Sequence, residues 1–241
     1  MDSKILQLRE LINRKESEKK SCQSISSGCL PLDRLLPQRG FQRRSLVEWI
    51  AGGAGSGASL LAMLTARSAC RGGGTLVLVD RAQSFYPPAA SACQLDLQNT
   101  IVVHPTNEKD ECWALEQALR CPDVAAVVAW PQRLTSHAFR RLQLAAEHGG
   151  SLGLLVRPAT ARHESSWASV RMLVSPRAVS PRASRQGWRL GVELLRCGGC
   201  LGTNLVELEI DDQTGEVRGA YPRPLAAQLA GTTPGPRKAR A

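Results

Sequence analysis

The fold of this chain is decided by residues 45–59, which carry the sequence SLVEWIAGGAGSGAS. Residues 45–51 are almost all apolar and predict a buried strand. Four glycines follow between positions 52 and 57, and the apolar positions after them predict a helix over 59–71. A strand, a glycine-rich turn and a helix in this order predict the beginning of a βαβ unit.

The same alternation continues outward from this stretch. Apolar runs predict strands at 75–79, 100–103, 124–129 and 152–156. Helices are predicted at 87–94, 108–119 and 135–148, with Trp113 among the apolar positions of the second. Strands that are apolar throughout and alternate with helices indicate a mostly parallel sheet with helices on both faces.

The pattern changes after Pro158. Strands are predicted at 168–174, 188–195, 204–210 and 216–220, and short turns join them. This indicates antiparallel C-terminal strands that extend the same sheet, so the predicted fold class is α/β. We expect three parts: an N-terminal helix and linker at 1–24, a core domain at 25–220, and a basic, proline-rich, disordered tail at 221–241.

The composition fits two kinds of surface. The 31 Lys and Arg residues exceed the 21 Asp and Glu residues, which gives a net charge of +10. Such an excess fits a nucleic-acid partner, and a solvated basic surface would explain it equally well. No signal peptide or membrane span is recognisable in the sequence, and the eight cysteines are spread through the chain. A cytoplasmic location is therefore expected.

The glycine-rich turn has the spacing of a phosphate-binding loop but lacks its charges. Such loops follow the pattern Gly-x-x-x-x-Gly-Lys-Ser/Thr, in which Lys contacts the phosphates and the hydroxyl contacts magnesium. Gly52, Gly55, Gly57 and Ser59 fit a degenerate version, but the Lys position is Ala58. The predicted strand 124–129 ends in Trp130 without the acidic residue that holds magnesium. We therefore expect a tight turn, no catalytic residues, no cofactor and no ATPase activity.

Two further patterns favour structure over chemistry. Cys197 and Cys200 form a C-x-x-C pair with no second pair and no nearby histidine, so a hairpin turn is expected there and no metal. A Ser/His/Asp hydrolase finds no support, because Gly55-Ser56-Gly57 lacks the glycine spacing of a nucleophile elbow.

The segment from 157 to 196 is strongly basic, with eight Arg against two Glu. Flexible arginines can follow a phosphate backbone, and a nearby tryptophan can stack on a base. The alternative is a solvated hairpin loop with Trp188 in the core. The nucleic-acid hypothesis names six residues: Arg157, Arg171, Arg177, Arg182, Arg185 and Trp188.

Several segments together resemble the RecA/KaiC-type ATPase core. They are residues 32–36, residues 45–52 with the degenerate loop, residues 168–171, and residues 188–210. The resemblance covers about 25–220 and is greatest to the ImuA family, RecA-like accessory proteins of bacterial translesion mutagenesis. At the positions of RecA's catalytic Glu and sensor Gln this chain has Ala82 and Arg157.

The resemblance implies a RecA-like sheet of the P-loop NTPase type and a non-catalytic role in the SOS response to DNA damage. It also implies RecA and a polymerase-like protein, ImuB, as partners, and contact with DNA through basic loops. Two other functions remain open. One is a DNA-dependent ATPase that uses residues 52–59, and the other is a cell-division inhibitor similar to SulA.

Overall fold

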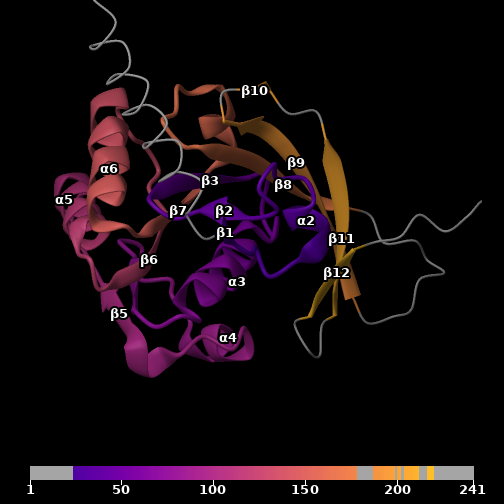
Figure 1. The fold of residues 1–241 in the computed structure, drawn as a ribbon, viewed down its shortest axis with the longest axis horizontal. Helices are drawn as coiled ribbons and strands as arrows, with labels where there is room; N and C mark the ends of the chain where they lie inside the picture. The colour runs from indigo at the N-terminus through magenta and orange to yellow at the C-terminus, as the bar shows by residue number, and fades with distance from the viewer. Residues whose placement is uncertain (1–23, 178–186, 199, 202–203, 212–215, 220–241) are drawn as a thin grey trace, which may run out of the picture.

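The computed structural model describes residues 24–177, 187–198, 200–201, 204–211 and 216–219 (Figure 1). These residues form a large sheet in the strand order β12-β11-β9-β8-β3-β7-β6-β4-β5, with β10 paired to β9. The predicted N-terminal helix and the predicted tail from 221 lie outside the described residues, as do Arg182 and Arg185.

One half of the sheet is parallel, as predicted. Strand β3 (Ser45–Ala51) lies between β7 (Leu152–Arg157) and β8 (Val170–Arg177) and is parallel to both. Beyond β7 lie three further parallel strands: β6 (Val124–Ala129), β4 (Thr75–Val79) and β5 (Thr100–Val103). Because β3 is fully enclosed by neighbours, the turn that follows it opens at the middle of the carboxyl edge of the sheet.

The other half is the predicted antiparallel extension, with one correction: the strand predicted at 168–174 is β8, which is parallel to β3 and begins the extension only through its antiparallel pairing with β9. Strand β9 (Gly187–Cys197) pairs antiparallel with β8 and with β11 (Leu205–Asp211), and β12 (Val217–Gly219) forms the edge. The short strand β10 (Cys200–Leu201) folds back on β9, so that Cys200 is paired with Cys197. The interpretation of the C-x-x-C pair as a hairpin turn is therefore confirmed.

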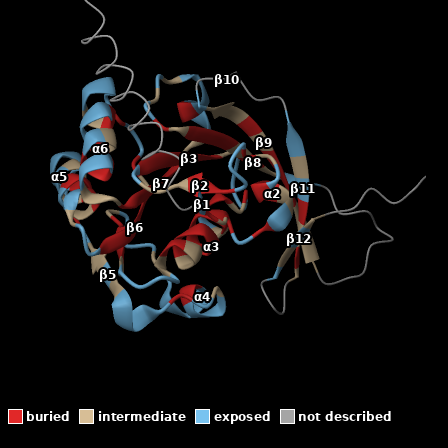
Figure 2. Cartoon of the chain, in the orientation of Figure 1, coloured by how far each residue is buried: buried red, intermediate tan, exposed pale blue. Residues whose placement is uncertain are grey.

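Helices cover both faces of the sheet (Figures 1 and 2). Helix α3 (Ala58–Cys70), α2 (Leu30–Asp33) and α4 (Pro87–Ala92) contribute to one hydrophobic core, whereas α5 (Glu108–Arg120) and α6 (Ser136–Gly149) contribute to the other. A separate two-stranded antiparallel sheet is formed by β1 (Ser24–Ile25) and β2 (Phe41–Gln42). Two 3-10 turns, η1 (Leu97–Asn99) and η2 (Ala159–His163), complete the described elements.

Local chemistry accounts for the ends of the two long helices on the second face. The side chains of Asn107 and Thr135 accept hydrogen bonds from the backbone at the beginnings of α5 and α6, and Gly150 ends α6 in a left-handed conformation. Of the apolar positions of α5, Trp113 is 63% exposed, and Leu115 and Leu119 are buried. None of the described helices is long and apolar enough to cross a membrane.

Candidate functional site

The glycine-rich turn between β3 and α3 combines two glycines that packing requires with two that face open space. A Cβ atom on Gly52 would lie 2.9 Å from the carbonyl oxygen of Val174, and one on Gly57 would lie 2.4 Å from Cδ1 of Leu190. Gly57 also has a φ of +79°, a left-handed conformation that favours glycine. Added Cβ atoms on Gly53 and Gly55 would meet nothing within 4 Å. Two of the four glycines therefore hold the turn against β8 and β9.

A pocket of about 460 Å³ lies above this turn. Its floor is the turn and the first residues of α3, and its walls come from the segments that follow β6 and β7 and from the beginning of β9. Two tryptophans, Trp130 and Trp188, line it together with Arg157 and Gln132. Its place at the carboxyl edge of a parallel sheet is the usual position of a ligand site in α/β proteins.

The hydroxyl that a phosphate loop offers to magnesium has a protein partner here. The indole Nε1–H of Trp130 donates a hydrogen bond to Oγ of Ser59 at 2.9 Å. Trp130 directly follows β6, the position where a carboxylate was expected and not found. Ala58, at the position of the missing Lys, is buried. The three positions that carry charge or a metal ligand in a phosphate loop thus hold an alanine, an engaged hydroxyl and an indole.

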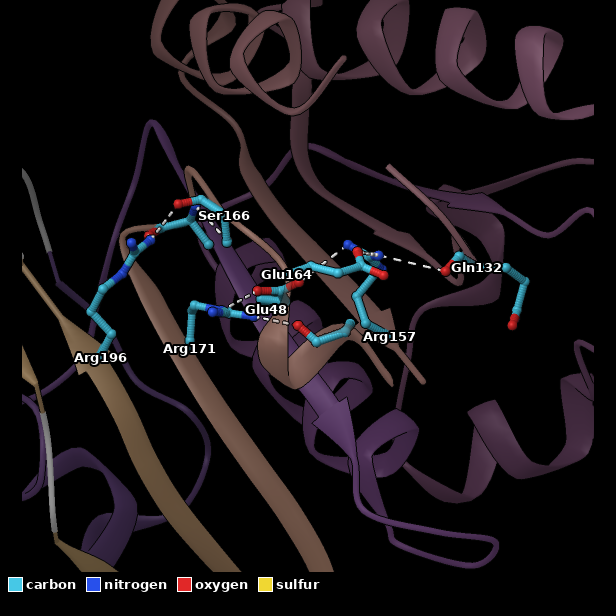
Figure 3. Close-up of polar contacts among 9 residues, drawn as sticks. Glu48, Gln132, Arg157, Glu164, Ser166, Arg171 and Arg196 are labelled. Atoms are coloured by element: carbon cyan, nitrogen blue, oxygen red, sulfur yellow. Dashed lines mark hydrogen bonds and ion pairs between the residues drawn. The ribbon is translucent and has the colours of Figure 1, made fainter. Parts of the chain in front are cut away.

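Behind the pocket lies a buried ion-pair network (Figure 3). The carboxylate of Glu48, in the middle of β3, accepts hydrogen bonds from the guanidinium groups of Arg157 at 3.2 Å and of Arg171 at 2.5 Å. Arg157 also pairs with Glu164 at 2.6 Å. Its side chain is 1% exposed, and its Nε is buried without a hydrogen-bond partner among the described residues. The negative charges of Glu48 and Glu164 therefore neutralise the positive charges of Arg157 and Arg171 in this network.

The network attaches the segment 158–168 to the sheet. Arg171 donates to the carbonyl of Ala161 at 2.7 Å, and Arg196 donates to the carbonyls of Ser166 and Ala168 at 2.8 and 2.6 Å. Burial, and the nearby Arg171 charge, lower the pKa of Arg196 below its usual value. The segment is thus fixed to β8 and β9 at three of its backbone carbonyl groups.

Two residues of the nucleic-acid hypothesis take part in the buried network. Arg157 and Arg171 are buried and ion-paired, so their guanidinium groups are engaged by protein carboxylates in this structure. Arg177 is exposed at the end of β8, and its side chain lies across Gly191. A Cβ atom added to Gly191 would lie 2.4 Å from Nε of Arg177. Trp188 is half-buried at the pocket wall and packs against the core. Both remain available to a ligand.

The expected position of a catalytic carboxylate holds an exposed alanine, Ala82. Asp80, which ends β4, is buried, and its carboxylate accepts from the backbone N–H of Phe85 at 2.6 Å. It therefore orders the turn after β4. Among the residues that the structure describes, no three His, Cys, Asp or Glu side chains are grouped as a metal site requires.

Two site residues were missed by sequence reasoning, Trp130 as the partner of Ser59 and Glu48 as the centre of the network. The sequence itself contains a feature that points to each of them. Glu48 is a charged residue inside an otherwise apolar strand, and a buried charge needs a partner of opposite sign. Trp130 stands where a metal-binding carboxylate was sought, and its indole N–H must find an acceptor when buried.

Comparison with known proteins gives no match to any family model. Two curated relatives named Protein ImuA, from two strains of Caulobacter vibrioides, are each 30% identical over 175 residues, which cover 66% of this chain and 69% of the relative. The cell division inhibitor SulA of Edwardsiella piscicida is 34% identical over 68 residues, covering 28% of this chain and 40% of the relative. Identity of this extent to the two Caulobacter proteins places this chain in the ImuA family.

Proposed function

We propose that this chain is a non-catalytic, RecA-like accessory protein of the DNA-damage response and of translesion mutagenesis. It acts in the cytoplasm by binding RecA and the polymerase-like partner ImuB. Membership of the ImuA family supports the pathway. The two partners come from the family resemblance, and the proposed role requires no chemistry at the glycine-rich turn.

The observation that carries the non-catalytic role is the set of side chains around the turn: Ala58 stands at the Lys position, and Trp130 stands where a carboxylate at the end of β6 would hold magnesium. A nucleotide would need a positive charge at the first position for the phosphates and a carboxylate at the second for magnesium. An alanine and an indole supply neither. Transition-state charge would go unneutralised, and the loss of a single such contact typically costs about 3–4 kcal/mol.

The architecture is consistent with a RecA-like scaffold. A central parallel strand leads through a glycine-rich turn into a helix, with further parallel strands on both sides and an antiparallel extension beyond. Of the arginines that the nucleic-acid hypothesis names, Arg177 is the described one that is exposed, and it neighbours Arg182 and Arg185 in the sequence. A contact of this kind would be electrostatic and independent of base sequence.

The test measures the affinity of the purified chain for purified RecA and purified ImuB, with and without ATP. We expect binding to at least one partner and the same Kd in both conditions, because the turn cannot respond to nucleotide. Phosphate release is measured in parallel with and without DNA and should stay at background. DNA-stimulated release that Gly57→Trp abolishes would establish the ATPase instead. A chain that binds neither partner would contradict the accessory role.

A role in cell division is the second candidate, because the SulA segment is 34% identical over 68 residues. Overproduction of the chain in growing cells separates the two. Filamentous cells that contain segregated nucleoids would favour inhibition of division, whereas normal division with altered damage-induced mutation favours the accessory role.

A further inference from the structure

Strand β5 leaves one edge of the sheet open. It lies at the end of the strand order, next to β4 and at the opposite edge from β12 (Figure 1). No other described strand pairs with its outer side. An edge of this kind presents unpaired backbone N–H and C=O groups, onto which another extended segment can add.

The direction of these groups follows from one hydrogen bond. The carbonyl of Val103 accepts from the N–H of Asp80, which follows β4. The N–H and C=O of one residue point to the same side of a parallel strand, and successive residues alternate. Val103 and Ile101 therefore face β4, and the backbone groups of Thr100 and Val102 face outward.

The side chains of β5 do nothing to protect this edge. The strand reads TIVV, four β-branched residues without a charge or a proline, and Ile101 is 54% exposed. Leu97, just before the strand, is a further exposed apolar side chain. Natural edge strands are commonly blunted by charge, by proline or by shortness. The opposite edge shows such protection, since β12 carries the exposed, charged Arg218.

Acidic residues flank the open edge at both ends. Asp96 precedes η1 and β5, and Glu108 and Asp110 lie in the first turn of α5 beyond it. Residues 96–111 contain four acidic residues and one lysine, in a chain whose formal net charge is +10. Arg81 pairs with the buried Glu111 at 3.0 Å and also contacts Glu108 at 3.8 Å, so the exposed acidic side chains here are Asp96, Glu108 and Asp110. The edge therefore offers backbone pairing, apolar side chains and local negative charge together.

We propose that the outer edge of β5 is a docking site for an extended, basic segment of a protein partner, which adds to the sheet as a strand. The inference deepens the proposed function, since it gives the accessory protein the surface through which a partner binds. Backbone pairing with Thr100 and Val102 would supply the affinity, and lysine or arginine side chains would approach Asp96 and Glu108.

A matched pair of variants at one position tests the backbone contact. Val102→Pro removes the outward N–H and keeps the pairing with β4, whereas Val102→Ala shortens the side chain and keeps the N–H. The probes are purified RecA, purified ImuB and a short end-blocked peptide of alternating valine and lysine. An equivalent peptide of valine and glutamate is the control for charge.

We expect Val102→Pro to weaken binding of the lysine peptide and of at least one protein by tenfold or more, and Val102→Ala to weaken it less than threefold. Hydrogen exchange should show the amide of Val102 becoming protected in the complex. Circular dichroism confirms that both variants fold. Glu108→Gln should weaken binding of the lysine peptide, and Glu147→Gln on α6 should not.

The outcomes separate this inference from the proposed function. If the lysine peptide binds and Val102→Pro abolishes that binding, the edge is a docking site, even if neither RecA nor ImuB binds. In that case only the accessory role is contradicted. If neither the peptide nor any bound protein responds to Val102→Pro, the inference is overturned and the accessory role is unaffected. Protection of the Val102 amide in the free chain also overturns it, because the edge is then already covered.

Discussion

Replacing Glu48 by glutamine tests the buried network directly. The change removes one negative charge and leaves the guanidinium groups of Arg157 and Arg171 facing a neutral amide in the middle of the sheet. Breaking a buried ion pair by removing one partner costs about 3–5 kcal/mol. Glu48→Gln should therefore lower the free energy of unfolding by about that amount, a large part of the roughly 5–15 kcal/mol typical of a domain.

Urea denaturation followed by circular dichroism measures the loss, and thermal denaturation should show a fall in Tm of about 6–20 °C. Arg162→Gln is the matched control, because Arg162 lies on the same segment but forms an exposed pair with Glu193 at 3.6 Å. That pair is largely screened by solvent, so its loss should cost less than about 0.5 kcal/mol.

The triple variant Glu48→Met, Arg157→Met and Arg171→Met should recover most of the lost stability, because apolar replacement of a whole buried network is often tolerated. A Glu48→Gln variant within about 1 kcal/mol of the wild type would refute the reasoning, since it would mean that water reaches the arginines.

Three further predictions concern the turn, a thiol and the basic surface. Gly57→Ala should destabilise the fold by about 2–4 kcal/mol through its left-handed backbone and its contact with Leu190, whereas Gly53→Ala should change the free energy of unfolding by less than about 0.5 kcal/mol in the same urea assay. Burial raises the pKa of Cys70 from 9.0 to about 11, so its thiolate forms less readily in the folded state. The free energy of unfolding should therefore fall as pH rises from 9.0 to about 11, and Cys70→Ala should reduce that fall. Arg177→Ala should weaken DNA binding equally for all sequences and flatten the plot of log K against log salt by about one unit, and an unchanged slope would mean that Arg177 contacts no phosphate.

Strands were predicted from the sequence more reliably than the roles of charged side chains. The bounds predicted for 75–79, 100–103 and 124–129 match β4, β5 and β6. Each is a short apolar run between turn residues. Burial within a parallel sheet requires that pattern for β4 and β6, whereas β5 keeps it at the edge without a buried residue.

The arginines show why the site was harder to predict. Arg157 and Arg171 lie in a segment with an excess of positive charge, and charge counting alone assigns such residues to a nucleic-acid surface. Their partner Glu48 lies 109 and 123 residues earlier in the chain. The contact between Trp130 and Ser59 spans 71 residues. Pairings over such separations depend on strand order, which no local pattern encodes.

The glycines of the turn are poor evidence for nucleotide binding. Gly52 and Gly57 are required by the close approach of β8 and β9, and this requirement holds whether or not a phosphate binds. The information about nucleotide therefore lies in the side chains around the turn. There, Ala58 brings no charge, and Ser59 and Arg157 are already engaged by other protein groups. Under the proposed function, which uses no chemistry at the turn, the protein acts through what its surface binds. The open edge of β5 and the exposed Arg177 are therefore the places to examine.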